Sequence, residues 1–168
     1  LFLICQNGKA VGRIAAFIDH LAVAHWKQKI GLFGSYECID DISVSGLLLE
    51  QAEKWLRERR MERMRGPWNF AAEEWGFLAE GYDKPPMMMS PYNPPYYNVQ
   101  LETYGLEKTK DLLVYELDTT HYQLPRRYLE FAEKVALKNG VRIRPVRMKQ
   151  LKEEVRLILK IANESTSQ

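Results

Sequence analysis

The alternation of apolar and polar residues predicts a β-hairpin and a third strand at the start of the chain. Apolar runs at residues 2–5 and 11–18 flank an Asn7-Gly8 pair. This pair favours a tight hairpin turn, because both turn residues need a positive φ. Residues 20–29 are polar and broken, so we expect an irregular connection there. The apolar run 30–38 predicts the third strand.

Three later stretches carry apolar residues at three- and four-residue steps, which is the spacing of a helix that buries one face. They are residues 44–56, 128–136 and 151–162. Asp41 is the expected N-cap of the first helix, and Pro125 fits the start of the second. Helices and strands therefore alternate, which indicates an α/β (α+β) fold.

Shorter patterns predict the remaining elements. Residues 61–65, 112–117 and 141–146 favour strands. Residues 96–104 favour a short helix, with Gly105 as the left-handed residue that ends it. We find no internal repeat.

A proline-rich stretch, Trp68 to Tyr97, predicts a long loop-rich insertion, because Pro-Pro pairs do not fit inside helices or central strands. It also holds Met87, Met88 and Met89. Its apolar side chains favour either core packing, a subunit interface or an apolar acceptor pocket.

Composition narrows the classes of protein. The chain has 168 residues, 46% of them hydrophobic and 27% charged, so we expect one globular domain with a small appendage. A net charge of +2 is too small to draw the chain to nucleic acid or a membrane through bulk charge. The two cysteines do not make a disulfide framework, and neither a signal segment nor a long apolar run is present, so a cytoplasmic location is expected. The three histidines lack metal-ligand spacing, so no metal is expected.

Five short motifs and the order of the elements carry a resemblance. The motifs are Val11–Ala16, Gly31–Gly34, Arg65–Phe70, Gly81–Asp83 and Tyr92–Tyr97. With the order hairpin, strand ending in Glu37, helix, short strand and Tyr-Gly-Leu turn, the chain resembles the GNAT (acyl-CoA N-acyltransferase) superfamily, in particular an uncharacterised bacterial subgroup.

The resemblance covers residues 1–118, which we expect to form a GNAT-like domain that lacks its first elements. Residues 119–168 would supply a linker helix, a short strand and the start of a second GNAT-like unit. The chain would thus be a fragment. The resemblance implies a twisted mixed, mostly antiparallel sheet flanked by helices and splayed between its central strands. It also implies acetyl-CoA or another acyl-CoA as substrate, with transfer of the acyl group to an amine acceptor of unknown identity.

The resemblance places the pantetheine arm of acyl-CoA along Tyr36, Glu37 and Cys38. It places the pyrophosphate on the loop and helix start that contain Ser43, Ser45 and Gly46, since helix N-termini favour anions. Asn69, after a Gly-Pro pair, is expected either to bind ligand or to cap the next segment. Cys38 could also be only a small buried apolar residue.

The catalytic residues implied by the resemblance are a general base and a general acid. Glu37 is the candidate base, with a pKa raised by burial, unless it is a solvated acid at the strand end. The tyrosine that acts as the general acid in the superfamily corresponds to Leu101 in this chain, and leucine has no proton to donate. Tyr97 and Tyr104 lie nearby and are the candidate substitutes.

Two departures from the family pattern leave a second hypothesis open. Asp41 and Val44 stand in the pyrophosphate loop where a polar residue and a glycine are usual, and a carboxylate repels a phosphate. With Leu101, they favour a catalytically degenerate module that binds a ligand or a partner. The unpaired edges of the sheet also predict self-association into a homo-oligomer.

Overall fold

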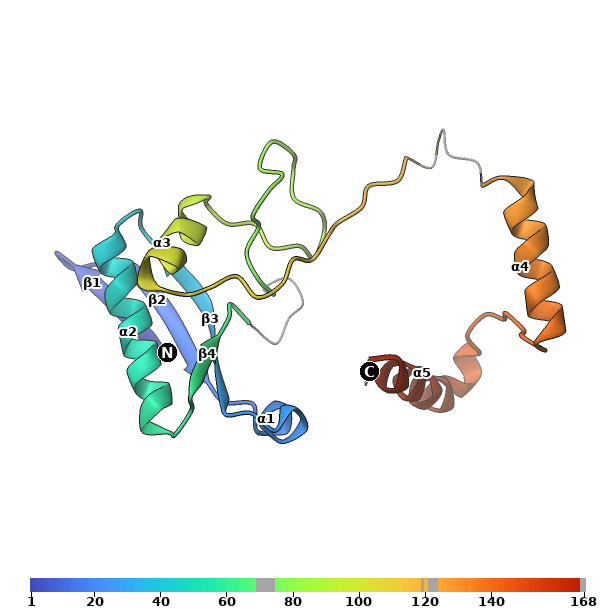
Figure 1. Ribbon diagram of the computed structural model, residues 1–168, viewed down its shortest axis with the longest axis horizontal. Helices are drawn as coiled ribbons and strands as arrows, with labels where there is room; N and C mark the ends of the chain where they lie inside the picture. Colours follow the sequence, from blue (N-terminus) through green and yellow to red (C-terminus); the bar gives the residue numbers. More distant parts are fainter. Residues whose placement is uncertain (69–74, 119, 121–123, 167–168) are drawn as a thin grey trace. The chain divides into compact units, whose positions relative to one another are not determined.

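The structure is a computed structural model that describes residues 1–68, 75–118, 120 and 124–166. The chain forms two compact units, Leu1–Asp111 and Leu112–Gln168. Figure 1 traces the elements of each unit in chain order.

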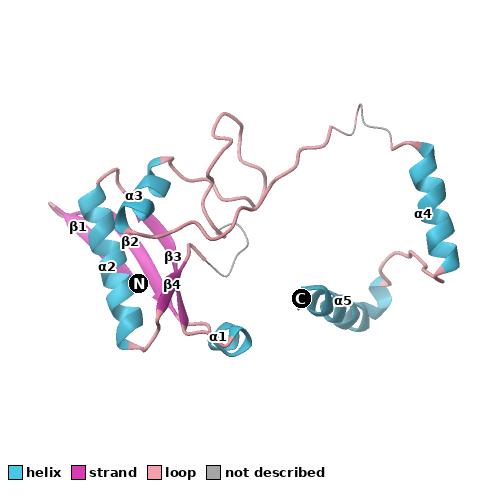
Figure 2. Ribbon diagram, viewed as in Figure 1, coloured by secondary structure: helices cyan, strands magenta, loops and turns pink. Residues whose placement is uncertain are grey.

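A four-stranded sheet organises the first unit, with the order β1-β2-β3-β4. The strands are β1 (Phe2–Gln6), β2 (Lys9–Phe17), β3 (Ile30–Cys38) and β4 (Arg63–Arg65). The pairs β1-β2 and β2-β3 are antiparallel, and β3-β4 is parallel. The sheet is therefore mixed and mostly antiparallel, and helices pack with it (Figure 2). This confirms the predicted α+β fold class.

The predicted hairpin is confirmed. Asn7 and Gly8 have φ values of 51° and 76° and join β1 to β2. The irregular connection expected at residues 20–29 is wrong in part, since α1 (His20–Trp26) forms there. Asp19 caps this helix by accepting hydrogen bonds from two backbone amides of its first turn. No residue of α1 is buried, which explains why the sequence has no apolar stripe that would predict this helix.

The long helix α2 (Ile42–Glu58) packs across the first three strands, as its apolar stripe predicts. Leu48, Leu49 and Ala52 are fully buried in this contact. Gly31 lets the helix approach the sheet, because a Cβ placed there would lie 2.4 Å from Leu56 Cδ2.

The edge strand β4 pairs with β3 over a short length. β3 pairs with β4 only from Ile30 to Leu32. Farther along β3, two residues, Ser35 and Tyr36, lie opposite the single Ile14 of β2. This is a β-bulge, and Ser35 has the positive φ, 47°, that a bulge can require. β3 therefore bends just beyond Phe33, whose carbonyl accepts a hydrogen bond from the Trp68 amide at 2.7 Å after β4 has ended.

Helix α3 (Tyr96–Tyr104) packs beside α2 and ends at Gly105, whose φ is 104°. The bounds of this helix and the left-handed Gly105 match the prediction. The described residues between β4 and α3 contain neither a helix nor a strand, in agreement with the predicted loop-rich insertion.

The second unit contains α4 (Arg126–Lys138), the 3-10 turn η2 (Met148–Gln150) and α5 (Leu151–Thr166). Both predicted long helices are confirmed. The predicted strands 112–117 and 141–146 are wrong: neither segment pairs with another strand among the described residues, and Ile143 is 97% exposed. A strand needs a hydrogen-bonded neighbour, which local sequence does not reveal.

Candidate functional site

The predicted site residues lie around the end of β3 and the first turns of α2, where α3 packs against both. They divide into three groups. Some are buried in a polar network, some line an open pocket, and Glu37 lies on the exposed surface.

The buried network joins β3, α2 and α3. The Tyr36 hydroxyl donates to Gln100 Oε1 at 2.8 Å and lies 2.7 Å from Ser45 Oγ, which therefore acts as the donor. Gln100 Nε2 donates to the Ile39 carbonyl at 2.8 Å. Burial raises the pKa of Tyr36, so its hydroxyl stays protonated. Tyr36 and Ser45, predicted to touch a cofactor, here hold the site together.

Sequence reasoning missed Gln100. It is only 2% exposed and holds the turn between β3 and α2. Its spacing was the available signal, because Gln100 lies three residues after Tyr97, on the buried face of α3.

Side chains of α3 also hold the last residue of β3. The Cys38 amide donates to the Tyr97 hydroxyl at 3.1 Å, and the Tyr96 hydroxyl donates to the Cys38 carbonyl at 3.1 Å. The backbone groups that the resemblance assigns to pantetheine at Cys38 are thus already bonded. Burial raises the pKa of the Cys38 thiol, which disfavours the nucleophilic thiolate. The geometry favours Cys38 as a packed apolar residue.

Glu37 lies on the opposite side of β3 from its buried neighbours Tyr36 and Cys38, because successive side chains alternate. Its side chain is 64% exposed and pairs with Arg13 at 2.9 Å. The expected burial of Glu37 is therefore wrong, and its carboxylate is a solvated strand-end group.

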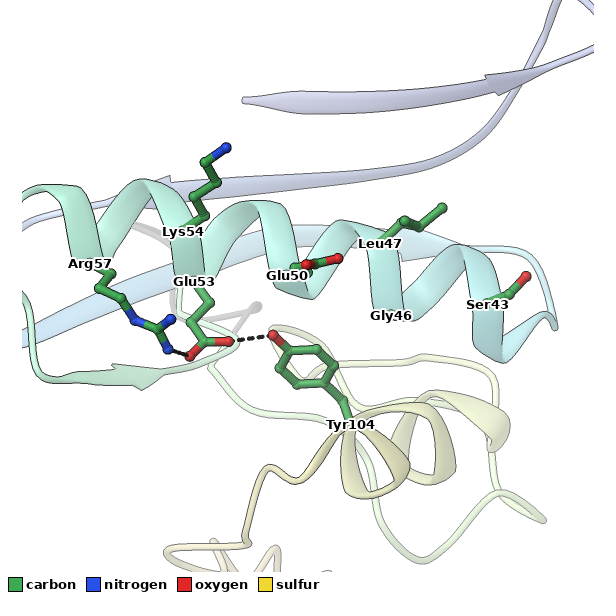
Figure 3. A pocket seen from close by; sticks show the side chains of 8 residues that line it. All are labelled: Ser43, Gly46, Leu47, Glu50, Glu53, Lys54, Arg57 and Tyr104. Carbon is green, nitrogen blue, oxygen red and sulfur yellow. Dashed lines mark hydrogen bonds and ion pairs between the residues drawn. The ribbon is translucent and has the colours of Figure 1, made fainter.

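An open pocket of about 590 Å³ runs along α2 and faces Tyr104 (Figure 3). Three predicted site residues meet in its lining: Ser43, Gly46 and Tyr104. The rest of the lining consists of Leu47, Glu50, Glu53, Lys54 and Arg57. A Cβ added to Gly46 would meet nothing within 4 Å, so this wall of the pocket is free for a ligand.

Tyr104 points from α3 toward α2 in Figure 3. Its hydroxyl donates to Glu53 Oε2 at 2.5 Å, and the other oxygen of Glu53 pairs with Arg57. Burial and the Glu53 carboxylate raise the pKa of Tyr104. Its proton is held in this bond, which opposes the predicted role as general acid.

The carboxylate of Asp41 already caps the N-terminus of α2. Asp41 Oδ1 accepts hydrogen bonds from the Ser43 amide at 2.8 Å and the Val44 amide at 3.4 Å, which confirms Asp41 as the N-cap. The Ser43 hydroxyl donates to the same oxygen at 2.6 Å, and these bonds lower the pKa of Asp41. The amides expected to bind pyrophosphate are therefore satisfied by the chain itself.

Asn69 lies outside the described residues. Leu101, at the position of the superfamily's general-acid tyrosine, belongs to the buried core.

Within the described part of the chain, no group of three or more His, Cys, Asp or Glu residues could hold a metal ion. The helices described here are all too short or too polar to cross a membrane.

Two curated bacterial proteins are similar to almost the whole chain. The chain is 36% identical over 172 residues to the bacterial ceramide synthase of Caulobacter vibrioides, a match that covers 99% of this chain and 44% of the relative. It is 32% identical over 159 residues to protein YghO of Escherichia coli, covering 94% of this chain and 40% of that relative. The chain thus spans less than half the length of the curated relatives it matches. No family model matches the chain, and neither does any solved structure.

Proposed function

We propose that this chain is part of a GNAT-like, acyl-CoA-dependent N-acyltransferase that joins a fatty acyl group to the amine of a long-chain amino alcohol. The observation that carries the proposal is the similarity, over 99% of the chain, to a protein named a ceramide synthase. A ceramide is an amide of a fatty acid and a long-chain amino alcohol. Its synthesis by acyl transfer forms the same C–N bond as the reaction that the resemblance implies.

The sheet supports this proposal through the bulge in β3 that follows its short pairing with β4. Parallel pairing covers only Ile30 to Leu32, and the bulge at Ser35 and Tyr36 follows. Bulges are common beside active sites, where they redirect the strand. An extended pantetheine arm would lie along this part of β3, before Cys38, whose backbone groups α3 already holds.

The reaction needs two proton transfers. The amine nitrogen attacks the thioester carbonyl, the C–N bond forms, the C–S bond breaks and CoA leaves as the thiolate. We assign acceptance of the amine proton to Glu37, directly or through water, although its carboxylate is exposed and paired with Arg13 and so lacks the burial expected of a general base. Tyr97 suits the return of a proton to the thiolate better than Tyr104 does. The Tyr97 hydroxyl accepts a hydrogen bond from the Cys38 amide, so its own proton is not engaged in that bond, whereas the Tyr104 hydroxyl donates its hydrogen to Glu53.

The pocket beside α2 supports binding of the phosphate end of CoA. The lining carries two basic residues, Lys54 and Arg57, and two acidic ones, Glu50 and Glu53, so the support comes from the open wall at Gly46 and not from an excess of positive charge. Gly46→Phe should fill this space without a clash inside the protein and weaken acyl-CoA binding by about tenfold or more, while Gly46→Ala should bind as the parent does. Calorimetric titration with palmitoyl-CoA measures both variants. Equal affinity for both variants would remove the pocket from the proposal.

A second candidate function rests on a specific observation. Asp41 occupies the helix amides that would bind pyrophosphate, and Leu101 replaces the acidic tyrosine with a core residue. These features favour a catalytically degenerate module that binds a ligand or a partner. An absence of heat from palmitoyl-CoA at millimolar concentration would support this candidate over the transferase.

A further inference from the structure

A tied loop, residues 78–93, projects from the first unit. Its two ends meet where Asn93 Oδ1 accepts a hydrogen bond from the Leu78 amide at 2.6 Å. Asn98 of α3 donates to the Leu78 carbonyl at 2.8 Å, and Tyr82 bonds to the same carbonyl. Asn93 is buried. The base of the loop is therefore fixed to α3, as in the compact Ω-loops that often carry function.

The outer part of this loop is apolar and exposed. Met87, Met88 and Met89, here called the methionine tip, are all exposed, and Met88 reaches 91%. The Ser90 amide donates to the Met87 carbonyl at 3.1 Å, which turns the chain at the tip. Tyr92, beside the tip, is exposed as well.

The tip lies in the longest stretch of the chain that has no charged residue, residues 85–101. Single exposed apolar residues are common, but three consecutive exposed methionines on a fixed base form a patch that favours leaving water. Methionine is unbranched and flexible, so it adapts to a fluid apolar partner. A tyrosine next to such a patch is typical of side chains at the boundary between hydrocarbon and water.

We propose that the methionine tip enters the hydrocarbon of a lipid bilayer surface, with Tyr92 at the headgroup level. The inference rests on the proposed function, because an amide with two long chains resides in a bilayer and the enzyme must meet it there. The contact is apolar, since the net charge of +2 gives little electrostatic attraction. Neutral lipid is therefore sufficient for binding.

The test is flotation of the full chain with neutral phosphatidylcholine vesicles. The triple variant Met87→Ser, Met88→Ser, Met89→Ser should lose about tenfold or more of its bound fraction, and the corresponding triple leucine variant should keep it. Met148, 71% exposed in the second unit, offers a matched control, and Met148→Ser should bind as the parent does. Oxidation by hydrogen peroxide, read by mass spectrometry, should be slowed by vesicles at residues 87–89 and not at Met148.

Four results would overturn the inference. The parent chain could fail to float with neutral vesicles, or the serine variant could float equally well. Binding could require anionic lipid and disappear in high salt, which would indicate basic residues instead of the tip. Self-association that the serine variant abolishes, without vesicle binding, would indicate a second copy as the partner.

The vesicle assay requires no acyl transfer, so it separates this inference from the proposed function. Transfer to a short-chain amine in solution, with no vesicle binding, would defeat the inference and keep the transferase. Vesicle binding by a chain that does not bind acyl-CoA would support the membrane contact of the methionine tip and refute the proposed transferase function.

Discussion

The hydrogen bond between Tyr36 and Gln100 should couple these two residues energetically. Gln100→Leu removes two bonds, one to Tyr36 and one to the Ile39 carbonyl. Tyr36→Phe also removes two, to Gln100 and to Ser45. At about 1 kcal/mol for each net hydrogen bond, each variant should lower the free energy of unfolding by about 2 kcal/mol. The double variant loses three bonds in total, so it should lose about 3 kcal/mol, which leaves a coupling energy of about 1 kcal/mol.

Urea unfolding followed by tryptophan fluorescence measures this coupling in the first unit alone. All four tryptophans of the chain belong to that unit: Trp26, Trp55, Trp68 and Trp75. Gln51→Leu is the matched control, because Gln51 is exposed on α2 and its change should cost less than about 0.5 kcal/mol. Additive effects of Tyr36→Phe and Gln100→Leu, within about 0.3 kcal/mol, would show that the buried network does not exist as described.

Two further predictions concern the ion pairs and the packing. Hydrogen bonds from Arg144 and Arg147 lower the pKa of Glu154 to about 2 from an ordinary 4.5. The ionised Glu154 therefore stabilises the fold at neutral pH, and this stabilisation is lost as the pH falls from 4.5 to about 2. Glu154→Gln should therefore lower the thermal midpoint of the helical circular dichroism signal at pH 7 and not at pH 2, and an equal effect at both would refute the pairing. Gly31→Ala should cost about 1–3 kcal/mol in urea unfolding because of its approach to Leu56. Leu56→Ala should recover part of that cost in the double variant, and strict additivity would contradict the close contact.

Local chemistry explains why most of the fold could be predicted. The Asn7-Gly8 turn and the Asp41 cap each depend on residues within a few positions, and both are confirmed. Helix α1 was missed because its signal was only the Asp19 cap, without a buried face. The strand expected at 112–117 was wrong because strand formation depends on a distant partner that pattern analysis does not supply.

The site was harder to predict, because its contacts join residues about 60 positions apart. Cys38 and Tyr97 meet only after α3 packs on the end of β3, and nothing near Cys38 in the sequence indicates that bond. Glu37 shows the reverse case. Strict alternation from buried Tyr36 and Cys38 already places Glu37 on the other face, so its exposure was available from the pattern.

Amide formation tests the central claim most directly. The chain is mixed with palmitoyl-CoA and a long-chain amino alcohol, and mass spectrometry and a thiol reagent measure amide and free CoA. The account predicts equimolar amide and CoA, with a rate that falls by about tenfold or more in Glu37→Gln and is kept in Gln51→Leu. Two results would contradict the assignment of the chain as an N-acyltransferase. Palmitoyl-CoA could stay intact, or it could be hydrolysed to CoA and free fatty acid without formation of the amide.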